Sequence, residues 1–264
     1  MSRKKKILQC WTRSLSITMC IVLLSITIFA ATVTSQVYHS NLYGYNYTTK
    51  SSATTTPGVG TCTVQALSNI VSSPSVPIGY MGIQTFLYNS NGVLEASSPI
   101  KYNPVMTNAL TATCSISVSN ATYYYCASGT AWLWNGSSYI SVTAGTTPYI
   151  APSFISKSGE EEYNSHKQPV LTKTMKKADY PVNQSGLAYG PALYAETYED
   201  IPDLIAAVGT NGISGYLYSE ELCSVGAISS PEEVIVLMPT SYTIPLYEKE
   251  GKTVIGAFVV SMQE

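Results

Sequence analysis

Histidine is scarce in this chain of 264 residues, which contains only His39 and His166. Neither stands in the frame of a catalytic motif, although a Ser-His-Asp site is defined by geometry and can be assembled from distant residues. Close cysteine pairs such as C-x-x-C are also absent, and the spacing of the cysteines matches no metal site. The sequence therefore predicts no catalytic residues, no metal and no cofactor.

Positive charge is also in short supply beyond the N-terminus. Residues 36–149 carry only Lys50, Glu95 and Lys101, whereas residues 186–264 carry two lysines against eleven acidic residues. Proteins that bind nucleic acid need clustered basic residues to displace counterions, so this composition argues against a nucleic-acid partner. The shift toward acidic residues also predicts a domain boundary between the two ranges.

The N-terminus has the pattern of an export signal. An uncharged apolar run over residues 14–31 follows a basic start, and small residues precede Gln36. This order is typical of a secretory signal peptide and predicts cleavage between Ser35 and Gln36. The run is also long enough to span a bilayer, so an uncleaved N-terminal anchor is the alternative. The sequence thus predicts a secreted, extracellular protein whose only membrane contact would be that uncleaved segment.

Four cysteines follow the predicted signal peptide, and an even number in an exported chain favours disulfides. Apolar and hydroxyl residues alternate around Cys114, as in a half-buried strand, and the chain is expected to turn at Asn120. A hairpin centred there places Cys114 opposite Cys126, within disulfide range. Elimination leaves Cys62 and Cys223 as the second pair.

Short strand patterns separated by turn residues fill the first half of the chain. They predict a mainly β protein with an antiparallel, sandwich-like N-terminal domain. In the last part, Asp200 predicts the start of a helix, a capping box at residues 230–233 predicts a second, and a hairpin is expected to turn at Gly251. A small α+β C-terminal module that folds independently is therefore expected. The predicted organisation is a signal peptide (1–35), an extended lead-in (36–60), an antiparallel β domain (61–149), a linker (150–185) and an acidic α+β module (186–264).

Asn135 followed by Gly136 predicts another hairpin, because a type I′ turn needs positive φ at both central residues. That two-residue loop places Trp132 opposite Tyr139 and puts both rings, with Trp134, on one face of the hairpin. The aliphatic residues fall on the other face. Only one face of a sheet in a sandwich packs on the partner sheet. The rings therefore either form an exposed platform that binds a ligand such as a sugar, or belong to the core.

Two blocks near the C-terminus, residues 198–222 (YEDIPDLIAAVGTNGISGYLYSEEL) and 244–260 (IPLYEKEGKTVIGAFVV), carry a family resemblance. Together with SPEE at residues 230–233, they resemble a C-terminal region of uncharacterised secreted proteins of Gram-positive bacteria. Residues 78–94 (IGYMGIQTFLYNSNGVL) are similar to the front halves of the same group. The resemblance implies an exported bacterial protein, and it implies no activity and no site residues.

These observations favour an exported, non-enzymatic protein whose β domain binds a cell-surface glycan or another envelope component through Trp132, Trp134 and Tyr139. Two other functions stay open. One is a secreted antibacterial or toxin-like β-sandwich protein that acts on a neighbouring envelope. The other is a hydrolase whose site the sequence does not reveal.

Overall fold

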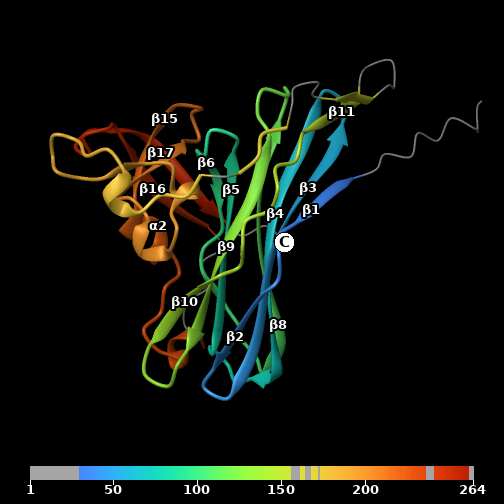
Figure 1. The fold of residues 1–264 in the computed structure, drawn as a ribbon, viewed down its shortest axis with the longest axis vertical. Helices are drawn as coiled ribbons and strands as arrows, with labels where there is room; N and C mark the ends of the chain where they lie inside the picture. Colours follow the sequence, from blue (N-terminus) through green and yellow to red (C-terminus); the bar gives the residue numbers. More distant parts are fainter. Residues whose placement is uncertain (1–29, 156–160, 164–167, 172, 236–240, 262–264) are drawn as a thin grey trace, which may run out of the picture.

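Most of the chain forms β-strands in the computed structural model, which describes residues 30–155, 161–163, 168–171, 173–235 and 241–261. The sheets are largely antiparallel, and the mainly β fold expected from the sequence is confirmed (Figure 1). Within these ranges no helix is long and apolar enough to cross a membrane. Most of the predicted signal peptide lies outside them.

The first sheet has five strands and is built from the N-terminal part of the chain. Its order is β1-β3-β4-β8, with β2 beside the first half of β3. Side chains along β3 and β4 alternate between buried and more exposed, because successive residues of a strand point to opposite faces. The strands are β1 (Ala31–Thr34), β2 (Tyr38–Leu42), β3 (Tyr45–Gly58), β4 (Thr61–Val76) and β8 (Thr107–Val118).

The second sheet runs from the N-terminal half into the C-terminal half. Its order is β10-β9-β5-β6-β17-β16-β15-β14-β13, and the short β7 pairs with β5. In the N-terminal half the strands are β5 (Met81–Asn89), β6 (Leu94–Ser97), β7 (Lys101–Tyr102), β9 (Tyr125–Trp134) and β10 (Tyr139–Thr143). In the C-terminal half they are β13 (Tyr189–Gly190), β14 (Leu204–Val208), β15 (Ser214–Tyr218), β16 (Ser241–Tyr247) and β17 (Val254–Ser261). A separate pair consists of β11 (Ser153–Ile155) and β12 (Glu161–Tyr163).

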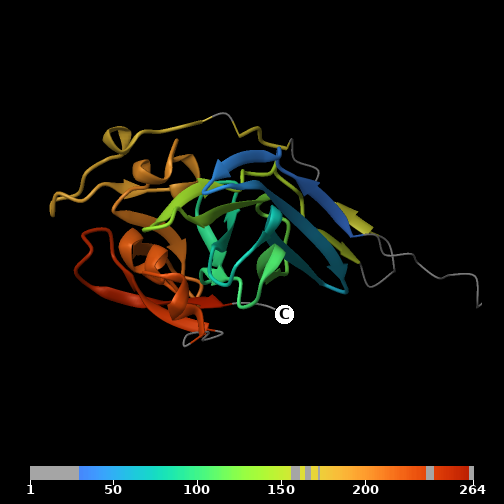
Figure 2. The ribbon, with the colours of Figure 1, turned by 90° about the horizontal axis from the view of Figure 1, so that it is seen from below.

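The two sheets pack face to face over the N-terminal half. Ala53 of the first sheet shares a cluster of buried side chains with Leu87 and Ala127 of the second. The backbones approach closely, since a Cβ atom on Gly129 would lie only 2.2 Å from the Ser68 hydroxyl. The other face of β5 and β9 is covered by C-terminal elements, which Figure 2 shows to one side of the N-terminal strands.

The C-terminal strands close into a ring that includes a strand of the N-terminal half. β6 pairs with β17 through Ser97 and Val260, and with β14 through Leu94 and Ala207. The pairs β17–β16, β16–β15 and β15–β14 complete the circuit. Strand β6 therefore belongs to both halves.

One hydrophobic cluster also spans both halves of the chain. Phe86 and Tyr88 of β5 pack with Leu217 and Phe258 of the C-terminal strands. This shared core is at odds with the expectation that residues 186–264 fold independently. The composition change that suggested a boundary reflects surface charge, whereas the buried faces of the two halves are both apolar.

The helix predicted from Asp200 is wrong. A 3₁₀ turn, η3 (Tyr198–Asp200), is followed closely by strand β14. That strand pairs with β15, β13 and β6, and this tertiary pairing overrides the local helix signals. The capping box begins the 3₁₀ helix η4 (Pro231–Ile235), and residues 236–240 lie outside the described ranges. The predicted α+β character is therefore not confirmed, whereas the hairpin turning at Gly251 is confirmed by the pairing of β16 with β17.

The four cysteines after the predicted signal peptide are free thiols, so the disulfide predictions are wrong. Cys114 lies on β8, which pairs with β4 of the first sheet, whereas Cys126 lies on β9, which pairs with β5 of the second. The chain between them crosses from one sheet to the other. Cys62 lies in the core between the sheets, and Cys223 lies on the short helix α2 (Ser219–Ser224). Local alternation predicted the strands, but it does not specify which sheet each strand joins.

The predicted cleavage site directly follows a strand of the fold. β1 pairs with residues 52–55 of β3, and the Ser35 N–H donates to the Ser51 carbonyl at 2.9 Å. The Ser51 N–H in turn donates to the Ser35 hydroxyl oxygen at 3.0 Å. Cleavage between Ser35 and Gln36 would therefore remove β1 from the sheet edge. The extended lead-in predicted over residues 36–60 contributes β2 and β3.

Candidate functional site

The predicted aromatic hairpin forms with a register two residues from the expected one. Trp134, and not Trp132, lies opposite Tyr139. The loop is longer than two residues, because it spans residues 135–138 between the paired Trp134 and Tyr139. The Asn135 side-chain oxygen accepts hydrogen bonds from the N–H groups of Ser137 and Ser138, both at 2.9 Å. Only Gly136 in this loop has positive φ. A shift of two residues keeps every side chain on its predicted face.

The three rings lie on the outer face of the second sheet. Leu133, which alternates with the tryptophans, is fully buried between the two sheets. The Trp132 ring meets the Tyr198 ring edge-on, with centroids 5.2 Å apart. The Tyr139 hydroxyl donates to the Gly79 carbonyl at 2.7 Å. The rings therefore form a half-buried aromatic cluster beneath C-terminal segments, in place of an open platform.

A cleft of about 640 Å³ adjoins this cluster, and Tyr198 borders both. Residues of β9 and β10 form one side of the cleft. Residues of α2, η3 and the 3₁₀ turn η2 (Ala192–Tyr194) contribute to the others. A cleft of this size is within the range that holds small-molecule ligands.

Hydroxyl groups line the side of the cleft formed by the sheet. Thr130 pairs with Thr143 across β9 and β10, and Ser141 lies two residues before Thr143 on the same face. The Thr146 hydroxyl donates to the Ser128 hydroxyl at 3.0 Å. The buried side chains of the lining include Phe86, Tyr88, Ile205 and Leu222. An apolar base with a few convergent polar groups is typical of ligand sites.

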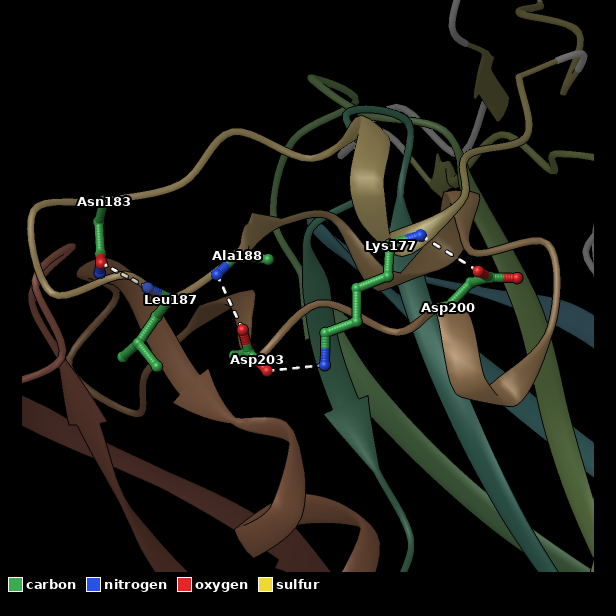
Figure 3. Close-up of polar contacts among 6 residues, drawn as sticks. All are labelled: Lys177, Asn183, Leu187, Ala188, Asp200 and Asp203. Carbon is green, nitrogen blue, oxygen red and sulfur yellow. Dashed lines mark hydrogen bonds and ion pairs between the residues drawn. The ribbon is translucent and has the colours of Figure 1, made fainter.

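Polar contacts hold together residues 173–203, the segment that contributes η2 and η3 to the cleft lining (Figure 3). Asp203 binds the Lys177 ammonium at 2.7 Å and the Ala188 N–H at 2.8 Å. Asp200 accepts a hydrogen bond from the Lys177 backbone N–H at 3.1 Å. Burial acts to raise the pKa of Asp203, but the hydrogen bonds from Lys177 and Ala188 and the lysine charge lower it overall. Asp203 is therefore ionised at neutral pH and fixes the position of the segment.

The acidic residues of this segment stabilise turns. Asp200 also accepts a hydrogen bond from the Thr197 hydroxyl, at 2.7 Å. In the described part of the chain, no group of three or more His, Cys, Asp or Glu side chains is arranged to hold a metal ion. His39 is exposed on β2 and does not line the cleft, and His166 falls outside the described residues. Among its described residues, the cleft lining thus includes no imidazole base.

One thiol, Cys223, borders the cleft from α2. Burial raises its pKa, and a hydrogen bond with Tyr198 lowers it only in part. The thiol therefore stays protonated at neutral pH, and a protonated thiol is a weak nucleophile. Cys223 contributes to the wall of the cleft and is poorly suited to covalent catalysis.

Sequence reasoning located the hairpin but missed most of the cleft. Thr130 and Ser141 carried a signal, because alternation places them on the same face as Trp132. No such signal exists for Tyr198, since this residue comes from a distant part of the chain and reaches the hairpin only in the folded protein.

Comparisons with protein-family models, with curated proteins and with solved structures found no match to this chain. The resemblance to secreted proteins of Gram-positive bacteria, carried by residues 198–222 and 244–260, therefore stays a prediction. The function is accordingly inferred from the cleft and its surroundings.

Proposed function

We propose that this chain is an exported, sandwich-like β protein that binds a glycan of the cell envelope without catalysing a reaction. The ligand would lie in the cleft bordered by Thr130, Ser141 and Tyr198. The observation that carries the proposal is the row of hydroxyl groups on β9 and β10 beside aromatic rings in a cleft of about 640 Å³.

The chemistry of the lining suits a sugar. Sugar rings present hydroxyl groups that donate and accept hydrogen bonds, and C–H faces that stack on aromatic rings. Serine and threonine hydroxyls also donate and accept, so Thr130 and Ser141 can pair with a sugar hydroxyl in either sense. Tyr198 adds both an aromatic face and a hydroxyl group. The charged residues of the lining, Lys173, Glu196 and Glu199, are solvent-exposed, and none of them belongs to β9 or β10, so the sheet side of the cleft is neutral.

The aromatic cluster has a supporting role in this proposal. Trp132 packs against Tyr198 and helps to set the position of that ring beside the cleft. Trp134 and Tyr139 pack against each other, with ring centroids 5.1 Å apart. None of these three residues lines the cleft among its described residues, so we assign the direct contacts to Tyr198 and the hydroxyl groups.

Two features support binding over catalysis. The thiol of Cys223 is protonated at neutral pH, and the described lining holds no histidine.

The basic start and the apolar run at residues 14–31 support export, after which the signal segment is either cleaved or retained as a membrane anchor. N-terminal sequencing of secreted and membrane fractions distinguishes these two forms, since an anchored chain keeps Met1.

Glycan-array screening followed by isothermal titration calorimetry tests the binding proposal. Thr130→Val combined with Ser141→Ala removes two hydroxyl groups with little change in shape. Each lost hydrogen bond costs about 0.5–1.5 kcal/mol. The Kd of the best-bound glycan should therefore rise by about 5- to 150-fold.

Thr63→Val is the matched control, because this threonine is exposed on β4 of the other sheet and does not line the cleft. It should leave the Kd unchanged. A protein that binds no glycan on the array, or a double variant that binds as tightly as wild type, would contradict the proposal.

A further inference from the structure

A second hollow, of about 510 Å³, lies beside the cleft. Its lining comes mainly from three segments, residues 34–36, 146–149 and 168–171. Tyr38, Thr146 and Leu171 line both hollows. Two hollows with three lining residues in common adjoin each other.

Tyr38 stands at the junction of the two hollows. Its ring lies against Gly145, where a Cβ atom would come within 2.5 Å of the Tyr38 Cε2 atom. Gly145 also has a φ of +78°, a left-handed conformation that glycine adopts without strain. The Tyr38 side chain is held on this glycine while the residue stays 39% exposed. An aromatic surface is therefore available to a ligand that passes from one hollow to the other.

The chain that follows β10 lines both hollows and is firmly held. The N–H groups of Ala144 and Thr147 donate to the carbonyls of Gly129 and Ala127 on β9, at 2.8 and 2.9 Å. The Thr147 hydroxyl oxygen also accepts a hydrogen bond from the Ala127 N–H at 3.0 Å. This part of the two hollows is formed before any ligand arrives, and preorganisation lowers the entropic cost of binding.

The second hollow is neutral among its described residues. Its lining contains hydroxyl, amide, aromatic and aliphatic side chains and no charged one. The charged residues of the first hollow, Lys173, Glu196 and Glu199, come from residues 173–203 and are exposed. A highly charged polymer would find no opposite charges in the second hollow, whereas hydroxyl groups of a neutral sugar could pair with groups such as the Gln36 amide.

We propose that the two hollows form one groove for a neutral, linear oligosaccharide, with Tyr38 between the sugar sites of the two halves. This inference rests on the proposed function and adds a preference for chain length. A disaccharide fills the first hollow only, whereas a longer chain passes Tyr38 and gains contacts in the second.

Calorimetric titration of the uncleaved chain, which keeps Thr34 and Ser35 in the second hollow, tests the inference with matched short and long sugars. The probes are maltose and maltohexaose, cellobiose and cellohexaose, and chitobiose and chitohexaose. In the series that binds, the hexasaccharide should bind at least about tenfold more tightly than the disaccharide. Gln36→Ala should weaken hexasaccharide binding by about 2- to 12-fold and leave disaccharide binding unchanged. Val37→Ala is the matched control, since Val37 is exposed beside Gln36 but lines neither hollow.

The outcomes separate this inference from the proposed function. Equal affinity for the two lengths, with Thr130→Val and Ser141→Ala together weakening both, would overturn the groove and leave the glycan-binding proposal standing. Tighter hexasaccharide binding that Gln36→Ala does not affect would also overturn the role of the second hollow. No binding at either length in all three series would overturn the groove and count against glycan binding as well.

Discussion

Phe258→Ala tests whether the two halves of the chain share one core. Phe258 lies on β17, is 2% exposed, and packs in the same cluster as Phe86 and Tyr88 of β5. Truncation of a fully buried phenylalanine costs about 3–5 kcal/mol, because apolar contacts are lost and a cavity remains. For a chain of this size, that loss lowers the Tm by roughly 6–20 °C.

Trp134 reports on the N-terminal half, because its ring packs on Tyr139 of the same hairpin. In a chain that also carries Trp11→Phe and Trp132→Phe, all tryptophan emission comes from Trp134. Thermal unfolding is followed by this emission and by far-ultraviolet circular dichroism, which reports on all strands. A shared core predicts that Phe258→Ala lowers both transitions together and by the same amount. Val259→Ala is the control on the same strand, and its 37% exposed side chain should cost at most about 1 kcal/mol.

Independent folding would give a different result. The circular dichroism curve of Phe258→Ala would split into two steps, and the emission transition would keep its wild-type midpoint. That outcome would refute the reasoning from the cluster and restore a domain boundary before residue 186.

Three further predictions follow from the same structure. Trp132→Ala should lower the free energy of unfolding by about 1–3 kcal/mol. The loss is smaller than for a fully buried tryptophan, because Tyr198 covers only part of the Trp132 ring. Unchanged stability in chemical denaturation would show that the ring is not packed. Alkylation followed by mass spectrometry should find four reactive thiols beyond residue 35 in the denatured protein, and a smaller number would indicate a disulfide. In the native protein Cys223 should react first, because the other three thiols are buried. Asp203→Asn should destabilise the protein by less than about 1 kcal/mol at pH 7, since its ion pair with Lys177 is partly exposed. The folded-state pKa of Asp203 is lowered from 3.8, so its contribution is present above that value and is lost as the pH falls through the folded pKa; a difference from wild type that persists at pH 2 would contradict this assignment.

Local patterns were sufficient to predict most strands of the N-terminal half. Alternation around Cys114 predicted part of β8, and the run around Trp132 predicted β9. The faces of the β9–β10 hairpin were also predictable, although the register was not. A side chain's face depends on a period of two within its own strand, whereas the register depends on the loop. Here the Asn135 side-chain oxygen accepts hydrogen bonds from two serine N–H groups in a loop longer than two residues.

The partners of those strands were not predictable in the same way. Cys114 and Cys126 lie close in sequence but belong to different sheets, so no hairpin brings them together. The segment after Asp200 carries helix signals and forms strand β14, because β15, β13 and β6 offer backbone partners there. Such partners lie far away in the chain and leave no mark on the local sequence.

By itself, the sequence determined that the chain is mainly β, which residues of each strand share a face, and that the surface carries little positive charge. Only the tertiary structure decided that β6 completes the C-terminal ring, that Tyr198 covers Trp132, and that Tyr38 stands between two hollows. The physical reason is that strand period and turn conformation are set by neighbouring residues. Sheet partners and clefts are instead selected by the burial and hydrogen bonding of the whole chain, which no short window of sequence contains.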